Sequence, residues 1–316
     1  MKIVMLEPLG VSEALIREKI QPVTAAGHEF VFCGEKLTDA QKLEAAKDAD
    51  IFIIANSPLT ADVINAAPNL KLISVGFTGV DHVDMGLCAE KGITVCNSQG
   101  YATDSTAELA VGLMLACLRN IVPYDDVVRD GGTLAGYTHN TLKGKTVGII
   151  GTGAIGTRVA AITKAFGCKI IGYSRSQRPE ALSLGLEYKD IDRVFAESDI
   201  VTLHAPLTAE TKGLASKQHI DSMKETAILI NCSRGPLVDS QALADALNEG
   251  RIAKAGIDVF ETEPPIAGDH PLLNAKNVIL TPHVGYYSEE SLAARADIVC
   301  KNISAWLAGK PVNVMK

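Results

Sequence analysis

The sequence predicts an α/β fold with two doubly wound parallel sheets. Short apolar runs rich in β-branched residues alternate with helical patterns along nearly all of the 316 residues. This alternation occurs twice, as two successive series of strands and helices. Strands that are apolar on both faces and separated by helices indicate parallel sheets with right-handed crossovers, because helices then cover both faces of each sheet.

The first series forms the N-terminal part of the chain. Its expected strands are Lys2–Leu6, Glu29–Cys33, Ile51–Ala55, Lys71–Val75 and Ile93–Cys96. Helical spacing of apolar residues predicts helices at Asp39–Ala49 and Val80–Lys91. Because this series is short, the helix predicted at Ser288–Leu307 is expected to return to it. The first domain should therefore be discontinuous and comprise residues 1–99 and 289–316.

The second series follows a loop predicted at Asp130–Thr133, where two glycines adjoin. Its expected strands are Thr146–Ile150, Lys169–Tyr173, Ile200–His204, Ala227–Asn231, Ala255–Asp258 and Val278–Thr281. An apolar stretch from Thr106 to Leu118 predicts a helix that leads into this series. The second domain should therefore span residues 100–288.

Composition excludes several classes of protein. Hydrophobic residues make up 47% and charged residues 21%, which is ordinary for a globular chain and excludes intrinsic disorder. Thirty basic against 37 acidic residues give a net charge of −7, which argues against nucleic acid and anionic membranes as partners. The longest charge-free apolar run is about half of the roughly 20 residues that span a bilayer. Seven scattered cysteines without a Cys-x-x-Cys pair predict reduced thiols, a cytoplasmic location and no metal site.

A strand running into Gly-x-Gly-x-x-Gly predicts a dinucleotide site of the Rossmann type. Gly151 would form the tight turn, Gly153 would let the backbone approach a pyrophosphate, and Gly156 would let the helix pack closely on the strand. The helix N-terminus, with Ala154 and Ile155, would present its amides and positive dipole end to the anion.

The turn after the next strand bears on the choice of cofactor. An NAD site usually has a carboxylate there for the ribose hydroxyls, whereas this turn carries Ser174, Arg175 and Arg178. These residues can bind and neutralise a 2′-phosphate. The sequence therefore favours NADP(H), and NAD(H) is retained as the alternative because both arginines can also be solvated loop residues.

Three further segments follow predicted strands of the second series, where open α/β sheets bind ligands. They are Ile230–Pro236 with Arg-Gly, Gly256–Pro264 with Asp-Val-Phe-x-x-Glu-Pro, and Leu280–Gly285 with Pro-His-x-Gly. Together with Gly76–Asp81 and Gly100–Glu108, these motifs resemble the D-isomer-specific 2-hydroxyacid dehydrogenases over nearly the whole chain. The resemblance implies a flavodoxin-like substrate domain beside a Rossmann-like nucleotide domain.

The resemblance implies three catalytic residues. Arg234 would hold the substrate carboxylate in a forked geometry, which a planar guanidinium suits. His283 would exchange a proton with the carbonyl oxygen, since imidazole titrates near neutral pH. Glu263 would contact the other ring nitrogen and stabilise the imidazolium. Glu261 is a rival for this carboxylate role, although the family spacing favours Glu263.

Further roles are implied by the resemblance alone. The substrate would be bound by Val75, Gly76, Phe77 and Tyr101, in addition to Arg234. The cofactor would be bound, besides the glycine motif and the turn after it, by Thr106, His204, Ala205, Pro206, Thr211, Cys232, Ser233, Asp258, His283 and Gly285. His204 is equally consistent with a histidine that only caps a loop at the end of its strand.

The sequence therefore predicts an NAD(P)-dependent D-2-hydroxyacid dehydrogenase. Its expected substrate is a small 2-oxo acid of the glyoxylate or hydroxypyruvate type, because the segment Val75–Gly79 is uncharged. A 3-phosphoglycerate dehydrogenase is the alternative within the same chemistry. A nucleotide-sensing, corepressor-like interaction module is the alternative of another class. The apolar 106–118 helix, the segments near it and the resemblance predict a homodimer.

Overall fold

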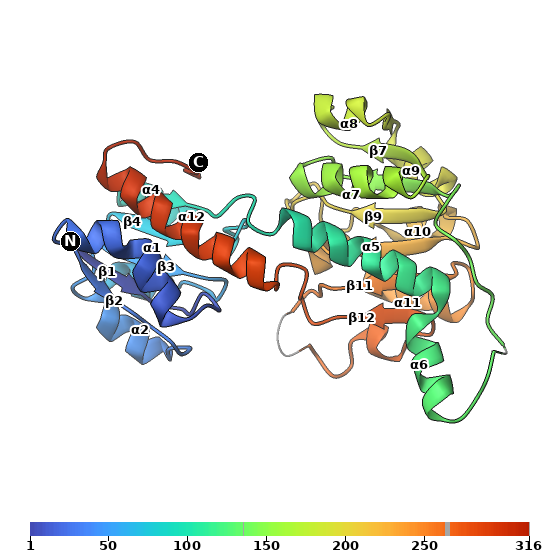
Figure 1. Ribbon diagram of the computed structural model, residues 1–316, viewed down its shortest axis with the longest axis horizontal. Coiled ribbons are helices and arrows are strands. Elements are labelled where there is room, and N and C mark those ends of the chain that lie inside the picture. The colour runs from blue at the N-terminus through green and yellow to red at the C-terminus, as the bar shows by residue number, and fades with distance from the viewer. Residues whose placement is uncertain (135, 263–265, 316) are drawn as a thin grey trace. The chain divides into compact units, whose positions relative to one another are not determined.

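The computed structural model describes residues 1–134, 136–262 and 266–315, and it divides them into two compact units. Unit 1 comprises Met1–Ala102 and Tyr287–Lys316, and unit 2 comprises Thr103–Tyr286. The chain thus passes between units at 102–103 and 286–287, where the sequence predicts 99–100 and 288–289. Both sheets are parallel, and the molecule has the mixed α/β fold that the sequence predicts (Figure 1).

Unit 1 contains a five-stranded sheet of order β2-β1-β3-β4-β5, the flavodoxin-like order. The strands are β1 (Lys2–Met5), β2 (Glu29–Val31), β3 (Ile51–Ile54), β4 (Leu72–Val75) and β5 (Thr94–Cys96). The helices are α1 (Glu13–Ala25), α2 (Asp39–Ala46), α3 (Ala61–Asn65), α4 (Met85–Glu90) and α12 (Glu289–Leu307). Strands β3 and β4 are buried along their whole length, as strands covered on both faces must be.

Helix α12 is the returning element that makes unit 1 discontinuous. Ser288 caps its first turn by accepting the Ser291 amide at 3.1 Å, and two glutamates follow, which favours a helix start. Its buried face includes Leu292, Val299 and Ile303 and packs against α1 and β4. In Figure 1 the red helix lies beside the blue elements of this unit.

Unit 2 contains a seven-stranded sheet of order β12-β11-β10-β9-β6-β7-β8. The strands are β6 (Thr146–Ile150), β7 (Lys169–Tyr173), β8 (Glu187–Tyr188), β9 (Ile200–Leu203), β10 (Ile228–Asn231), β11 (Lys254–Ile257) and β12 (Val278–Leu280). The strand order reverses between β6 and β9, so this is the topological switch point at which such sheets bind ligands. Only the two-residue β8 was not predicted, because it is too short to leave a pattern.

Two helices of unit 2, α7 and α5, bear on the predicted cofactor site and on the predicted dimer. They are α5 (Thr103–Arg119), α6 (Ile121–Arg129), α7 (Ala154–Ala165), α8 (Pro179–Ser183), α9 (Ile191–Glu197), α10 (Lys217–Ser222) and α11 (Ser240–Asn248), with 3-10 turns at Gly235–Leu237 and Pro271–Asn274. Helix α7 starts at Ala154, so Gly156 lies in its first turn. Helix α5 packs against α7, β10 and β11, and its apolar side chains are buried in the unit's own core.

Candidate active site

The glycine turn between β6 and α7 is built by close backbone approaches. Gly151 has φ +93°, and a Cβ there would lie 2.6 Å from the His204 carbonyl oxygen. A Cβ on Gly156 would lie 2.0 Å from the Gly151 carbonyl oxygen. At Gly153, in contrast, a Cβ would meet no atom within 4 Å. Packing therefore requires glycine at the two outer positions, while the middle one borders open space.

The N-terminus of α7 suits an anion. Gly153 is its N-cap, and no side chain caps the helix. The first amides of a helix have no partner within the helix, and the helix dipole is positive at this end. A pyrophosphate in the open space beside Gly153 would satisfy these amides, of which Ala154 and Ile155 carry the first two.

His204 directly follows β9, the neighbour of β6. Its Nε2 lies 2.9 Å from Thr202 Oγ1, whereas its Nδ1 is buried and has no hydrogen-bond partner among the described residues. Burial lowers the pKa of His204 to about 4, so the ring is neutral at pH 7. The backbone of His204 closes the Gly151 turn, and its neutral ring is held by Thr202, which supports the loop-capping interpretation; the buried Nδ1 is a place for a ligand's polar group.

The loop after His204 is held by its own hydrogen bonds. Thr211 Oγ1 donates to the Pro206 carbonyl at 2.6 Å and accepts the Thr208 amide at 2.7 Å. Ser233 Oγ donates to the Ala205 carbonyl at 2.6 Å and so joins this loop to the end of β10. The Thr211 hydroxyl donates its proton within the chain. Its role there is to shape the loop whose Ala205 and Pro206 are expected to bind the cofactor.

The turn after β7 carries Ser174, Arg175 and Arg178. Ser174 is half-buried and both arginines are exposed. Glu210, on the loop after β9, has a pKa that is lowered mainly by hydrogen bonds from Thr208 and its own backbone, with a smaller contribution from the positive charge of Arg175. A carboxylate thus lies within the electrostatic reach of Arg175.

Arg234 is fixed at the end of β10 by Asn231. The Asn231 side chain accepts the Ser233 amide at 3.1 Å and donates to the Arg234 carbonyl at 2.9 Å. The guanidinium is half-buried and donates to the Ser233 carbonyl at 2.8 Å. A Cβ on Gly235 would lie 2.0 Å from the Phe260 carbonyl carbon, so the Arg-Gly motif allows the segment after β11 to pass close by.

Asp258 organises the segment that carries His283. Its carboxylate is fully buried and accepts three hydrogen bonds, from Thr281 Oγ1 at 2.5 Å and from the amides of Val284 and Gly285, each at 2.9 Å. The His283 amide donates to the Asp258 carbonyl at 2.7 Å, and His283 has φ +55°, an uncommon conformation for a histidine. Burial raises the pKa of Asp258 against the opposing effect of these hydrogen bonds. The aspartate therefore fixes the position from which the imidazole projects.

Thr106 and Gly285 join the same group. Thr106 Oγ1 donates to the Gly285 carbonyl at 3.1 Å, and a Cβ on Gly285 would lie 3.0 Å from Asp258 Oδ2. The structure thus brings together Thr106, Asp258, His283 and Gly285, four residues that the resemblance implies bind the cofactor.

The predicted carboxylate Glu263 lies outside the described residues. Its rival Glu261 accepts hydrogen bonds from Ser240 Oγ at 2.6 Å and from His270 Nε2 at 2.8 Å. Burial raises the pKa of Glu261, but these two hydrogen bonds outweigh it and the pKa is lowered overall. Glu261 is therefore engaged with a different histidine, which argues against the rival assignment.

Cys232 is not a nucleophile. It is buried beside the Arg234 segment, and burial raises the pKa of its thiol well above the ordinary value. Reactive cysteines need a thiolate. Cys232 is therefore a neutral, buried side chain next to the Arg234 segment.

In unit 1 the loop after β4, which is expected to bind substrate, uses the Gly76 amide within the chain. The Gly76 amide donates to the Ile54 carbonyl at 2.8 Å, so it extends the sheet and is not available to a substrate. Asn97 and Ser98 take up the carbonyls of Val75, Phe77 and Thr78 through three hydrogen bonds of 2.7–2.9 Å. The amides of Thr78 and Gly79 donate no hydrogen bond within the described part of the chain.

A buried arginine that the sequence reasoning missed lies under this loop. Arg295 of α12 is 3% exposed, and its guanidinium carbon lies 5.3 Å from the Phe77 ring centroid and 5.7 Å from that of Tyr101. Its Nη2 donates to the Leu9 carbonyl. The two rings contact each other edge to face at 5.9 Å. Phe77 and Tyr101 are thus brought together, as two predicted substrate residues should be, by a cation that is remote in sequence.

The two tyrosines after His283 have different surroundings. Tyr286 packs edge-on against the His283 ring, with centroids 5.3 Å apart, whereas Tyr287 is 61% exposed. Tyr286 is therefore the one that adds bulk beside the imidazole.

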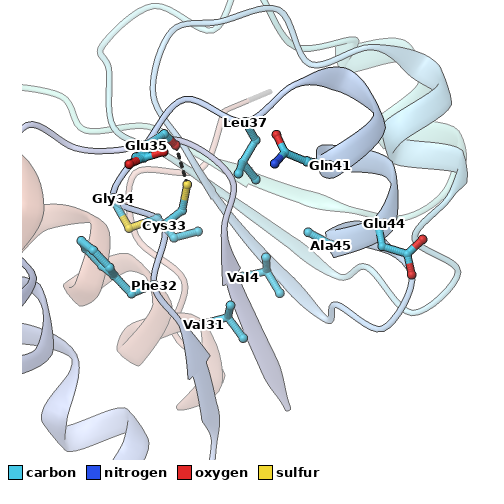
Figure 2. A pocket seen from close by; sticks show the side chains of 11 residues that line it. Val4, Val31, Phe32, Cys33, Gly34, Glu35, Leu37, Gln41, Glu44 and Ala45 are labelled. Carbon is cyan, nitrogen blue, oxygen red and sulfur yellow. Dashed lines mark hydrogen bonds between the residues drawn. The ribbon is translucent and has the colours of Figure 1, made fainter.

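A cavity of about 480 Å³ in unit 1 is separate from all these residues. It is lined by residues of β1, β2 and α2 and by the loop between the last two, including Val4, Phe32 and Leu37 (Figure 2). Cys33 Sγ donates to the Glu35 carbonyl there at 2.7 Å, and burial raises the pKa of the thiol. The cavity therefore offers no reactive group, and no predicted site residue lines it.

Metal-binding clusters and membrane-spanning helices are features of the fold that bear on its chemistry. Among the residues that the structure describes, no group of three or more His, Cys, Asp or Glu side chains is placed to hold a metal ion. In the same part of the chain, no single helix is long and apolar enough to cross a membrane. The bent pair α5–α6 has that length and composition only when its two helices are taken together.

Comparison with known proteins agrees with the geometry. Residues 111–285 match the family model described as D-isomer specific 2-hydroxyacid dehydrogenase, NAD binding domain. A hydroxypyruvate reductase of Blautia hydrogenotrophica is 38% identical over 299 residues, which cover 92% of each chain. A D-3-phosphoglycerate dehydrogenase of Methanocaldococcus jannaschii is 40% identical over 98% of this chain, but this chain spans only 58% of its length.

A solved structure is similar over the full length. An acyclic imino acid reductase in complex with NADPH and D-Arg superimposes with a TM-score of 0.88, with 30% identity and complete coverage of both chains. The architecture of both units is therefore that of a nicotinamide-dependent reductase.

The depressed pKa of His204 predicts a pH dependence of stability. A histidine that titrates near 6.5 when unfolded and near 4 when folded leaves stability intact above pH 6.5 and lowers it as the pH falls towards 4. The loss is about 2 kcal/mol at pH 5. In His204→Gln, urea denaturation at neutral pH and at pH 5 should show a smaller change in the free energy of unfolding than in the parent. An equal change in both proteins would contradict the assignment.

Proposed function

Since the chain belongs to the D-isomer-specific 2-hydroxyacid dehydrogenases, we propose that it reduces glyoxylate or hydroxypyruvate with NADPH. The enzyme is an oxidoreductase acting on CH–OH donors, and it transfers a hydride between a nicotinamide nucleotide and a small 2-oxo acid to give the D-2-hydroxy acid. The observation that carries the proposal is the pair Arg234 and His283, which follow β10 and β12, the two neighbours of β11, and are fixed there by Asn231 and Asp258.

Each unit supplies its own part of the reaction. The nicotinamide supplies the hydride when it is bound. Arg234 binds the substrate carboxylate through its planar fork, and we assign the amides of Thr78 and Gly79 to the same carboxylate in place of Val75 and Gly76. His283 donates a proton to the carbonyl oxygen as negative charge develops there, and it takes the proton back in oxidation. Glu263 is proposed to stabilise the imidazolium.

The residues of unit 1 favour a small, uncharged substrate tail. Val75–Gly79 has no charged side chain, and Phe77 and Tyr101 are each 7% exposed. Arg295 lies beneath these rings at 3% exposure, so its guanidinium is not exposed on the surface of the loop for direct contact. A substrate phosphate would thus meet no cation here, which argues against the phosphoglycerate dehydrogenase alternative.

The alternative nevertheless has support from the 40% identity to a D-3-phosphoglycerate dehydrogenase. Steady-state kinetics with glyoxylate, hydroxypyruvate, pyruvate, a branched 2-oxo acid and 3-phosphohydroxypyruvate, each with NADPH and NADH, decide between the two. The proposal expects the highest kcat/KM for glyoxylate or hydroxypyruvate. A preference for 3-phosphohydroxypyruvate would overturn it, and no turnover of any acid would favour the nucleotide-sensing module.

Replacement of the proton donor should separate chemistry from binding. His283→Ala should lower kcat by about 10²–10⁴-fold, the usual contribution of a positioned acid–base group. The Kd for NADPH, measured by fluorescence titration, should stay within a few-fold of that of the parent. His139→Gln is the matched control, since His139 is exposed and its ring stacks on Tyr124 and forms a hydrogen bond with the Tyr124 hydroxyl, away from the proposed site. Unchanged turnover in His283→Ala would remove the proton-transfer role.

The preference for NADPH rests on Arg175 and Arg178. Arg175→Ala should raise the Kd for NADPH by about 10-fold, the value of one charge-assisted hydrogen bond at a partly exposed site, and change that for NADH by much less. Glu210→Gln should have the opposite effect, because it removes the negative charge within reach of Arg175. Equal losses for the two nucleotides in Arg175→Ala would contradict the 2′-phosphate contact.

A homodimer is proposed through α6, which is one of the segments near the 106–118 helix. The apolar side chains of α5 itself are buried within unit 2. Helix α6 instead exposes Ile121, Val122 and Val128 by 55%, 50% and 70%. A second copy of this chain would cover such a face. Val128→Asp should then reduce the molar mass in light scattering to that of one chain, and a monomeric parent would refute the dimer.

The cysteines support a reducing compartment. All seven lie in described segments, are buried and are free. Burial raises the pKa of Cys96 to about 11 and that of Cys117 to about 12, so these thiols stay protonated. We propose the cytoplasm as the location on this basis.

A further inference from the structure

One tyrosine hydroxyl joins the glycine turn to the turn after β7, the two turns that the sequence assigns to the pyrophosphate and to the 2′-phosphate. Tyr188 ends the short edge strand β8, where it pairs with Gly172 of β7. Its hydroxyl lies 2.6 Å from Thr152 Oγ1 and accepts the Arg178 amide at 2.9 Å. Thr152 is the residue between the first two glycines of the glycine turn, and Arg178 ends the turn that carries Ser174 and Arg175.

The Thr152 side is rigid. Thr152 is fully buried, and its carbonyl accepts Thr157 Oγ1 of α7 at 3.1 Å. Gly151 and Gly156 are locked on either side by backbone packing. The Thr152 hydroxyl is therefore a fixed point to which the Tyr188 hydroxyl is attached.

The Arg178 side is otherwise exposed. Residues 175–178 are all exposed, and Arg178 serves as the N-cap of α8 without a side-chain cap. An exposed turn of this kind fluctuates unless its backbone is held. The hydrogen bond from the Arg178 amide to Tyr188 is the contact that ties this turn to the buried part of the unit.

We propose that Tyr188 is a positioning residue for cofactor choice. Its hydroxyl holds the Ser174–Arg178 turn in a fixed relation to the glycine turn, so that the two arginines are preorganised for the 2′-phosphate while the α7 N-terminus binds the pyrophosphate. Preorganisation raises affinity because the turn does not have to be ordered on binding. This inference rests on the proposed use of NADPH.

Tyr188→Phe tests the proposal with the loss of a single oxygen atom. The ring stays packed against the core cluster of α5 and β6. In fluorescence titrations the Kd for NADPH should rise about 10-fold, as expected for one lost hydrogen bond to a binding turn, and the Kd for NADH by less than about 3-fold. Tyr124→Phe is the matched control, because its hydroxyl forms a hydrogen bond with His139 Nε2 at 3.0 Å and neither residue belongs to the proposed site. Unchanged binding in Tyr188→Phe, or equal losses for both nucleotides, would overturn the proposal.

Two further measurements separate this inference from the choice of cofactor itself. In hydrogen–deuterium exchange of the cofactor-free protein, the Arg178 amide should exchange faster in Tyr188→Phe than in the parent. Thr152→Val should weaken NADPH as well, and the double variant should lose no more than the larger single loss. If the parent prefers NADH, the proposed cofactor fails, while faster exchange and non-additive losses would still support the role of Tyr188. Unchanged exchange with additive losses would refute that role.

Discussion

A buried carboxylate at the end of β11 constrains the reaction centre more than any other group. Asp258 accepts three hydrogen bonds from a five-residue segment and takes a fourth contact through its own carbonyl, to the His283 amide. A left-handed backbone at a histidine is held only when its surroundings determine it. His283, the proposed proton donor, is thus positioned by the residue that follows β11.

The same arrangement is repeated along the sheet. Strands β11, β10, β9 and β6 are neighbours, and each delivers one functional residue from its carboxyl end: Asp258, Arg234, His204 and Gly151. In each case a packed backbone or a buried hydrogen bond fixes the turn. Residues that are more than a hundred positions apart become one site because parallel strands place their carboxyl ends at one edge.

Sequence reasoning found what is local in the chain. The strand pattern, the glycine spacing and the three motifs each depend on residues within about ten positions, so composition and spacing expose them. It could not tell the direction of a side chain or of an amide. The Gly76 amide donates to Ile54 within the sheet, and the apolar side chains of α5 are buried within unit 2.

The contacts that no sequence motif predicts are those between elements that are distant in the chain. Arg295 lies in a helix whose pattern indicated only packing, and nothing in its neighbours places it against Phe77 and Tyr101. Tyr188 lies in a strand too short to predict. Such contacts follow from the topology, which brings α12 against β4 and β8 against β7. They become visible only when the chain is folded.

The loop after β4 is supported entirely from within unit 1, and this shapes selectivity. Asn97 and Ser98 hold its carbonyls, Leu9 leaves no room for a Cβ at Gly76, and Arg295 holds its aromatic ring from below. What the loop presents is therefore backbone amides and an apolar wall. Such a wall separates acids that differ by one methylene by only about 1–3 kcal/mol, whereas a phosphate left without a partner costs more. Small 2-oxo acids should thus be distinguished weakly from one another and strongly from phosphorylated ones.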